Sequence, residues 1–263
     1  MADGAETTMH LTILGSGTCV PSAERYPAAY LLEMEDAPPC LVDAGGGAPW
    51  RLAQTPVSYR SLDTLLLSHA HPDHTAGIVP LVQGLMYTPD FTRTAPLRIC
   101  GLQPVLESVE RVLRAYPALV PDFPLDWVEL TDGAELAVGR CGVSCRELAH
   151  AVPVLGYRFT LDGLTFAYAT DTGPCDALIA LLQGADAALV ECSFPRGGET
   201  STHLTTATAG EAARQAGVGT LVLTHFYPRI AGMTEAARTA EIRAAGYTGG
   251  IVYARDLMRI PLG

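Results

Sequence analysis

Short apolar runs alternate with turn-forming residues along the whole chain. A run of about four to eight apolar or β-branched residues bounded by glycine or proline is typical of a buried strand. In the first half, the pattern predicts strands at residues 10–14, 30–33, 40–43, 64–67 and 96–100. In the second half, it predicts strands near Val128, Val143, Tyr157, Phe166, Leu189, Leu221 and Ile251.

Segments with helical spacing lie between these strands. In residues 104–116 the apolar side chains stand at positions 105, 106, 109, 112 and 113, which is one face of a helix, and Pro117 ends it. Further helices are expected at residues 49–54, 75–82, 176–183, 207–216 and 234–245. Strands and helices that alternate in both halves, with no linker rich in proline, glycine or serine, predict a single layered α/β domain over residues 1–263.

Composition narrows the function classes. The net charge is −11, from 28 acidic residues against 17 basic ones, all of them arginine. This balance opposes binding to polyanions, because nucleic-acid binders display basic patches. Residues 1–6 lack the basic and apolar segments of a signal peptide, and no apolar run reaches membrane-spanning length. We therefore expect a cytoplasmic protein with no membrane partner.

Cysteine and glycine patterns offer two weaker signals. The seven cysteines show no paired spacing, so reduced and mostly buried thiols are expected. Cys141 and Cys145 stand four apart, but no second pair completes a zinc-binding pattern. Gly15-Ser16-Gly17 lacks the further residues of a nucleotide loop, and a tight turn is favoured over nucleotide binding.

Side chains that can bind a metal are most concentrated in the segment Ser68-His69-Ala70-His71-Pro72-Asp73-His74, where the strand at 64–67 is followed by a loop. Imidazole nitrogen and carboxylate oxygen are ligands that Zn²⁺ prefers. Two histidines two positions apart share one face of an extended backbone, so His69 and His71 can meet one ion. Pro72 then ends the strand, and the turn can aim Asp73 and His74 at a second ion. The cluster predicts a metal site.

Four more candidate ligands are scattered at strand ends and in loops: His150, Asp171, His203 and His225. Each has an ordinary structural explanation. An aspartate before Thr-Gly is often a turn former, and a histidine at a strand end is often solvated. Because a metal site at 69–74 needs further ligands, and strand ends on one rim of a sheet are where α/β proteins build sites, these residues become candidates together.

These motifs resemble the metallo-β-lactamase superfamily over nearly the whole chain. The pattern His69-x-His71-x-Asp73-His74, followed by His150, Asp171 and His225, carries the resemblance. Gly15-Ser16-Gly17-Thr18 with Pro21 and Arg25, and Leu41-Val42-Asp43-x-Gly45, look like its N-terminal signature. The segments Glu191-Cys192-Ser193-Phe194, His203-x-Thr205 and Leu221-Val222-Leu223-Thr224-His225-Phe226 look like the ribonuclease Z branch.

The resemblance implies a four-layer αββα sandwich, with two mixed sheets face to face and helices outside. It implies two divalent cations, expected to be zinc, with manganese or iron in some relatives. His69, His71 and His150 would hold the first cation, Asp73, His74 and His225 the second, and Asp171 would bridge them. His203 matches the proton-transfer histidine of the branch. Asp43 would accept a hydrogen bond from a ligand histidine and fix its tautomer, and Ser68 and Thr224 are expected beside the ligands.

The expected activity is hydrolysis of a small, cyclic or RNA phosphodiester by a hydroxide held between the two ions. Asp73 would orient that hydroxide, and His203 would protonate the leaving oxygen. Arg25, Arg196 and Arg229 are candidates for phosphate binding, because guanidinium forks match phosphate oxygens. Their alternative is an ordinary solvated arginine.

One departure concerns tRNA. Ribonuclease Z carries a tRNA-gripping arm between its third metal histidine and its bridging aspartate, but here His150 and Asp171 are only 21 positions apart. Two strands joined by an Asp162-Gly163 turn fill that gap. Together with the acidic balance, this disfavours tRNA 3′ processing, although a homodimer could lend a binding surface. A thioester or lactone hydrolase and a non-catalytic metal carrier of the same fold also stay open.

Overall fold

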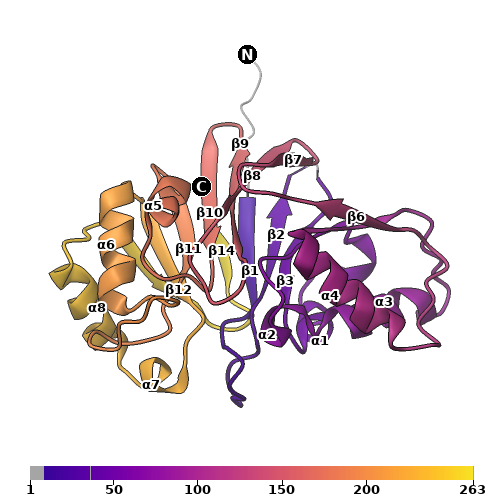
Figure 1. The fold of residues 1–263 in the computed structure, drawn as a ribbon, viewed down its shortest axis with the longest axis horizontal. Helices are drawn as coiled ribbons and strands as arrows, with labels where there is room; N and C mark the ends of the chain where they lie inside the picture. The colour runs from indigo at the N-terminus through magenta and orange to yellow at the C-terminus, as the bar shows by residue number, and fades with distance from the viewer. Residues whose placement is uncertain (1–8, 36, 263) are drawn as a thin grey trace.

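The computed structural model describes residues 9–35 and 37–262. The first six residues, where no export signal is expected, lie outside this part of the chain. The described chain forms two sheets packed against each other, with helices on both outer sides (Figure 1). This is a four-layer αββα sandwich, as the sequence predicts.

The first sheet comes mainly from the N-terminal half. Its strands are hydrogen-bonded in the order β14 (Arg259–Pro261), β1 (Met9–Gly15), β2 (Ala29–Met34), β3 (Cys40–Ala44), β4 (Thr64–Leu66), β5 (Leu97–Gly101) and β6 (Leu125–Glu129). The run from β3 to β6 is parallel, so these strands share one carboxyl edge. The outer side is covered by α1 (Ala48–Leu52), α2 (Pro72–Thr75), α3 (Ile78–Tyr87) and α4 (Gln103–Arg114), with a short 3₁₀ turn at Tyr59–Ser61.

The second sheet comes from the C-terminal half. Its order is β13 (Gly250–Tyr253), β12 (Thr220–Thr224), β11 (Ala187–Glu191), β10 (Leu164–Ala169), β9 (Leu155–Leu161), β8 (Cys141–Glu147) and β7 (Glu135–Val138). Strands β10 to β13 are parallel, whereas β7 to β10 are antiparallel. Its outer side carries α5 (Asp176–Leu182), α6 (Thr206–Ala216) and α8 (Glu235–Ala244), and α7 (Pro228–Ala231) follows β12.

Two apolar clusters hold these layers together. One contains side chains from both sheets, among them Ile13, Leu32, Phe159 and Tyr168, and therefore fills the space between the sheets. The other packs the second sheet against α5, α6 and α8. A buried hydrogen bond also connects the two halves of the chain, because the Tyr157 hydroxyl donates to the Leu67 carbonyl at 2.7 Å.

The helix expected at residues 75–82 is displaced. The chain instead makes the short α2, breaks at Ala76-Gly77, and starts α3 at Ile78. At the break the chain passes close to another backbone segment, and a Cβ on Gly77 would lie 2.4 Å from the Gly45 carbonyl oxygen. The Gly77 amide donates to the Ala44 carbonyl at 2.8 Å, so this close approach holds the chain against the end of β3.

Other local predictions can be checked in the same way. Asp162 and Gly163 have φ angles of 49° and 90° and join β9 to β10 as a two-residue hairpin, as the sequence predicts. All seven cysteines are free, and five of them are buried. No helix in the described part of the chain is long and apolar enough to cross a membrane.

Candidate metal centre

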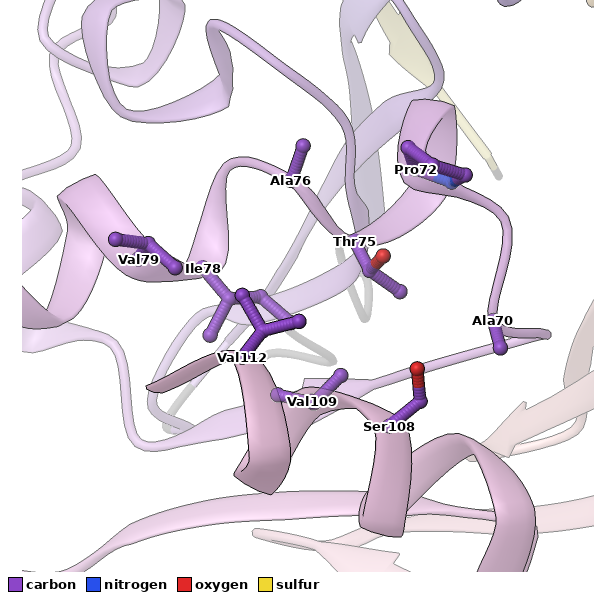
Figure 2. Close-up of a pocket in the computed structure, with 9 residues that line it drawn as sticks. All are labelled: Ala70, Pro72, Thr75, Ala76, Ile78, Val79, Ser108, Val109 and Val112. Carbon is purple, nitrogen blue, oxygen red and sulfur yellow. The ribbon is translucent and has the colours of Figure 1, made fainter. Parts of the chain in front are cut away.

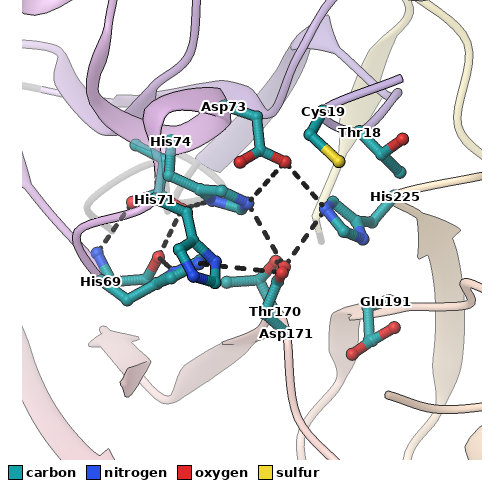
Figure 3. A network of polar contacts seen from close by, with 12 residues as sticks. Thr18, Cys19, His69, His71, Asp73, His74, Thr170, Asp171, Glu191 and His225 are labelled. Carbon is teal, nitrogen blue, oxygen red and sulfur yellow. Dashed lines mark hydrogen bonds and ion pairs between the residues drawn. The ribbon is translucent and has the colours of Figure 1, made fainter. Parts of the chain in front are cut away.

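The candidate site lies where strand ends from both sheets meet. The segment 68–74 follows β4, Asp43 stands near the end of β3, Asp171 follows β10 and His225 follows β12. Parallel strands present their carboxyl ends at one edge of a sheet, which is where α/β proteins place their sites. Two halves of the chain thus contribute side chains to one centre (Figure 3).

The local structure of the 68–74 segment follows from Pro72. This proline occupies the first turn of α2, where it needs no amide hydrogen bond and its fixed φ suits the helix. Asp73 and His74 therefore fall in that turn, and their side chains are buried, with exposed fractions of 8% and 0%. His69 and His71 precede the turn, and His69 Nε2 lies 3.0 Å from His71 Nδ1.

Asp171 lies at the middle of the site. Its Oδ1 is 3.3 Å from His74 Nε2 and 3.2 Å from His225 Nε2. Its Oδ2 is 3.7 Å from His69 Nε2 and 3.9 Å from His150 Nε2. One carboxylate therefore turns a separate oxygen toward each of two histidine groups, which is the arrangement that a bridging ligand requires.

Asp73 belongs to the same group as His74 and His225. Its Oδ2 lies 3.6 Å from His225 Nε2 and 3.7 Å from His74 Nε2. Asp73 and Asp171 thus approach these two imidazoles from different elements of the fold (Figure 3).

The donor atoms fit a divalent cation. The Nε2 atoms of His74, His150 and His225 are buried without a hydrogen-bond partner, and a buried polar atom without a partner is costly. The ligand atoms of His69, His71, His150 and Asp171 lie within 4.8 Å of one another, as do those of Asp73, His74 and His225. Neutral imidazoles and carboxylates at this spacing are a zinc-type donor set. The fold and these clusters imply divalent metal binding.

The pKa shifts of the candidate ligands show that the buried carboxylates favour a positive charge at the centre. Burial disfavours charge on the His74 imidazole, yet Asp171 and Asp43 raise its pKa well above the usual value. Burial opposes ionisation of Asp171 as well, but the charges of His225 and His74 hold its pKa well below the usual value. Burial lowers the pKa of His69 to about 2. The carboxylates thus favour positive charge at this position, and a bound cation would compete with a proton for His74.

Asp43 accepts hydrogen bonds from His74 and from residues next to the candidate ligands. Its Oδ2 accepts bonds from the His74 Nδ1 at 2.7 Å, the Ser68 hydroxyl at 2.7 Å and the Tyr168 hydroxyl at 2.6 Å. Its Oδ1 accepts the Ser68 amide at 2.7 Å. A carboxylate on Nδ1 leaves Nε2 of His74 as the atom for a cation and fixes the ring orientation.

Replacing Asp43 tests this support. Asp43→Asn would face an amide NH₂ toward groups that all donate, and we expect metal affinity to fall by about 10–100-fold. Calorimetric zinc titration measures this loss, and the thermal midpoint reports folding. The exposed Asp122, changed to Asn, is the matched control. Zinc affinity within twofold of wild type in Asp43→Asn would show that Asp43 does not position the ligand.

Glu191 and Ser193 are further residues at the site that the sequence did not single out individually. The Glu191 carboxylate is fully buried and accepts the Thr172 amide at 2.7 Å and the Ser193 hydroxyl at 2.5 Å. The Ser193 hydroxyl also lies 3.1 Å from His225 Nδ1. An acidic residue at the end of the apolar strand 187–191 was the available signal, because a buried carboxylate needs partners.

His203 stands beside the candidate ligands. Its Nδ1 lies 3.0 Å from Glu191 Oε1, and a ring nitrogen lies within 4.8 Å of ligand atoms of Asp171 and His225. Burial lowers its pKa, but the hydrogen bond and charge of Glu191 outweigh burial and raise it. A histidine held in one orientation by a carboxylate is suited to proton transfer.

Backbone strain concentrates at this centre. Asp43, Asp171 and His225 have φ angles of 54°, 40° and 57°, in the left-handed region that non-glycine residues rarely adopt. Such conformations cost roughly 1–3 kcal/mol each and persist where the surrounding structure imposes them. The strand ends are therefore bent to aim these side chains inward.

The remaining candidates lie in different surroundings. Ser68 reaches His69, with its hydroxyl 3.0 Å from the ring Nδ1, whereas the Thr224 hydroxyl meets that of Tyr30 at 2.9 Å. Arg25 is engaged elsewhere, since its Nη1 donates to the Ser16 hydroxyl and the Ala254 carbonyl. Arg196 and Arg229 are exposed.

A separate hollow of about 200 Å³ lies on the outer side of the 68–74 segment (Figure 2). Ala70, Pro72, Thr75, Ile78, Val79 and Val112 are among the residues that line it. Its lining is mostly apolar and contains none of the candidate ligands. It is therefore distinct from the centre around Asp171.

Known proteins share sequence similarity with this chain. Residues 40–226 match the model of the β-lactamase superfamily domain. Ribonuclease Z of Mycobacterium bovis is 31% identical, with 96% of this chain and 98% of that protein covered. Ribonuclease Z of Streptomyces coelicolor is 30% identical over 96% of this chain and 97% of its own length.

Solved structures share the fold. The metallo-β-lactamase fold protein YhfI from Bacillus subtilis superposes with a TM-score of 0.84 at 23% identity, covering 97% of this chain and 100% of that one. The short form of human tRNase Z gives a TM-score of 0.75 at 19% identity, covering 97% and 99%.

Proposed function

The chain belongs to the metallo-β-lactamase superfamily, in its ribonuclease Z-like branch, and is a metal-dependent hydrolase; from this premise we propose that it hydrolyses phosphodiesters with two divalent cations. The observation that carries the proposal is Asp171, whose two oxygens face two different histidine groups. His69, His71 and His150 would hold one cation, and Asp73, His74 and His225 the other. When bound, the cations polarise the phosphoryl group and acidify a water molecule.

The residues of the chain supply orientation and a proton. The buried Asp73 carboxylate faces the second group and would orient the attacking water. The contact between His203 and Glu191, at 3.0 Å, holds the imidazole in one orientation. A protonated His203 can then protonate the leaving alkoxide, which is the difficult step for a poor leaving group. Arg196 and Arg229, both exposed, are the free candidates for contacts to phosphate oxygens, whereas Arg25 would have to exchange its present partners.

Chelation and a substrate panel test the proposal together. The panel contains bis-p-nitrophenyl phosphate, cyclic nucleotides, lactoylglutathione and homoserine lactones, and the same preparation is analysed for metal. We expect turnover of phosphodiesters that stops on chelation and returns with zinc or manganese. Turnover of the thioester or the lactones alone would replace the proposed substrate class. Two bound metals without hydrolysis of any compound would favour a carrier protein.

A second candidate is maturation of tRNA 3′ ends, which is favoured by the relatives that carry the name ribonuclease Z. Against it stand the net charge of −11 and the short segment between His150 and Asp171, which β9 and β10 occupy. Cleavage of a precursor tRNA transcript at its 3′ end, by protein whose oligomeric state is measured in parallel, would decide for this candidate.

A further inference from the structure

Two aromatic side chains lie beside the metal centre without being part of it. Phe194 and Tyr227 stack at a centroid distance of 5.2 Å with an angle of 25° between their planes. Both rings meet the His203 imidazole edge-on, at 5.9 Å for Phe194 and 6.0 Å for Tyr227. Tyr227 also stands edge-on to His225 at 5.9 Å. The pair therefore flanks the side of the site where His203 lies.

The hydrophobic core accounts for only one face of this pair. Phe194 and Tyr227 are both partly buried; Tyr227 packs against the second apolar cluster, whereas Phe194 belongs to neither cluster. Their neighbour Phe226 is different, because it is 3% exposed and packs under the guanidinium groups of Arg25 and Arg238. Phe226 is therefore buried, whereas Tyr227 is partly exposed beside the centre.

We propose that Phe194 and Tyr227 form a stacking platform for a planar ring on the leaving group of the substrate. This specificity rests on the proposed phosphodiesterase function. An offset-stacked pair with an accessible face accepts a third ring, and stacking on a protein aromatic tolerates any base or aryl group because each has a π face. The leaving group departs on the side of the acid, His203, which is the side that the pair flanks. The predicted preference is for nucleoside or aryl leaving groups over alkyl ones.

The Tyr227 hydroxyl has a separate partner. It lies 3.6 Å from the thiol of Cys19, next to Thr18 at the edge of the centre (Figure 3). Tyr227→Phe removes this hydroxyl and keeps the stacking face, which provides a control.

The test compares two substrates whose leaving oxygens have similar acidity but differ in shape. Methyl phenyl phosphate carries a planar ring, and methyl hexafluoroisopropyl phosphate does not. Tyr227→Leu and Phe194→Leu are each expected to lower kcat/KM for the phenyl ester by about 10-fold, the effect of losing one stacking contact, and to change the alkyl ester less than twofold. Tyr227→Phe is expected to retain the preference, and the distant, exposed Tyr87→Leu is the matched control.

Equal losses on both esters would show that the rings only support the site, and no loss on either ester would show that the rings do not form a stacking platform.

A second measurement separates this inference from the proposed function. Phenyl phosphate and methyl phosphate are titrated into the zinc-loaded protein by calorimetry. If wild type hydrolyses neither ester and none of the phosphodiesters of the panel, the phosphodiesterase proposal is wrong, and a binding preference for phenyl phosphate that disappears in Tyr227→Leu still supports the platform. Equal affinity of wild type for both monoesters would overturn it.

Discussion

Replacing Asp171 with alanine is expected to abolish phosphodiester hydrolysis, with a loss of about 10³-fold or more in kcat. The reason is that one buried carboxylate faces both histidine groups, with Oδ1 about 3.2–3.3 Å from His225 and His74 and Oδ2 at 3.7 Å from His69. Without it, the two groups would lose the ligand that we propose they share, and the buried imidazoles would lose the negative charge that would balance a cation. Metal analysis and steady-state rates on the same preparation measure both losses.

Two comparisons sharpen the Asp171 prediction. Asp171→Asn keeps the shape of the side chain but removes its charge, so it separates electrostatics from packing. Asp122→Ala removes an exposed carboxylate and is expected to leave metal content and rate unchanged. If Asp171→Ala kept two metals and the full rate, the bridging assignment would be wrong.

Replacing His203 with alanine should give a different result. The variant is expected to retain its metals but to lose about 10²–10⁴-fold in kcat on a substrate with a poor alkoxide leaving group, which is the usual contribution of a general acid. With p-nitrophenolate as the leaving group the loss should be much smaller, because that anion needs no proton. Rates on the two kinds of diester, with metal content measured in parallel, test the prediction.

A histidine outside the centre provides the control. His10 lies in β1, outside the centre, and His10→Ala should change neither the rate nor the metal content. A His203→Ala variant with full activity on the poor leaving group would contradict the acid role. Loss of metal in that variant would instead make His203 a ligand.

Part of the site was readable from the sequence because its residues are contiguous. The 69–74 segment concentrates three imidazoles and a carboxylate where an apolar strand ends. The distant residues His150, Asp171 and His225 could be named as strand-end candidates, but their pairing came only from the family resemblance. No local pattern says which oxygen of Asp171 faces which histidine, because that depends on how two sheets pack.

The supporting residues were harder to predict. Glu191 and Tyr168 lie within apolar strands, and their roles appear only when Glu191 meets His203 and Tyr168 meets Asp43 across the fold. The helix expected at 75–82 was displaced, and its break at Gly77 lies close to the backbone of Gly45, a neighbour distant in sequence. The edge strands β7 and β14 were not predicted, since they are only 4 and 3 residues long, too short to show a clear alternating pattern.

The most direct test of a two-cation centre is anomalous X-ray diffraction at the zinc edge from crystals of the zinc-loaded protein. Two peaks are expected, one bounded by His69, His71 and His150 and the other by Asp73, His74 and His225, with Asp171 in contact with both. A single peak, or zinc bound only outside this cluster, would contradict the central claim.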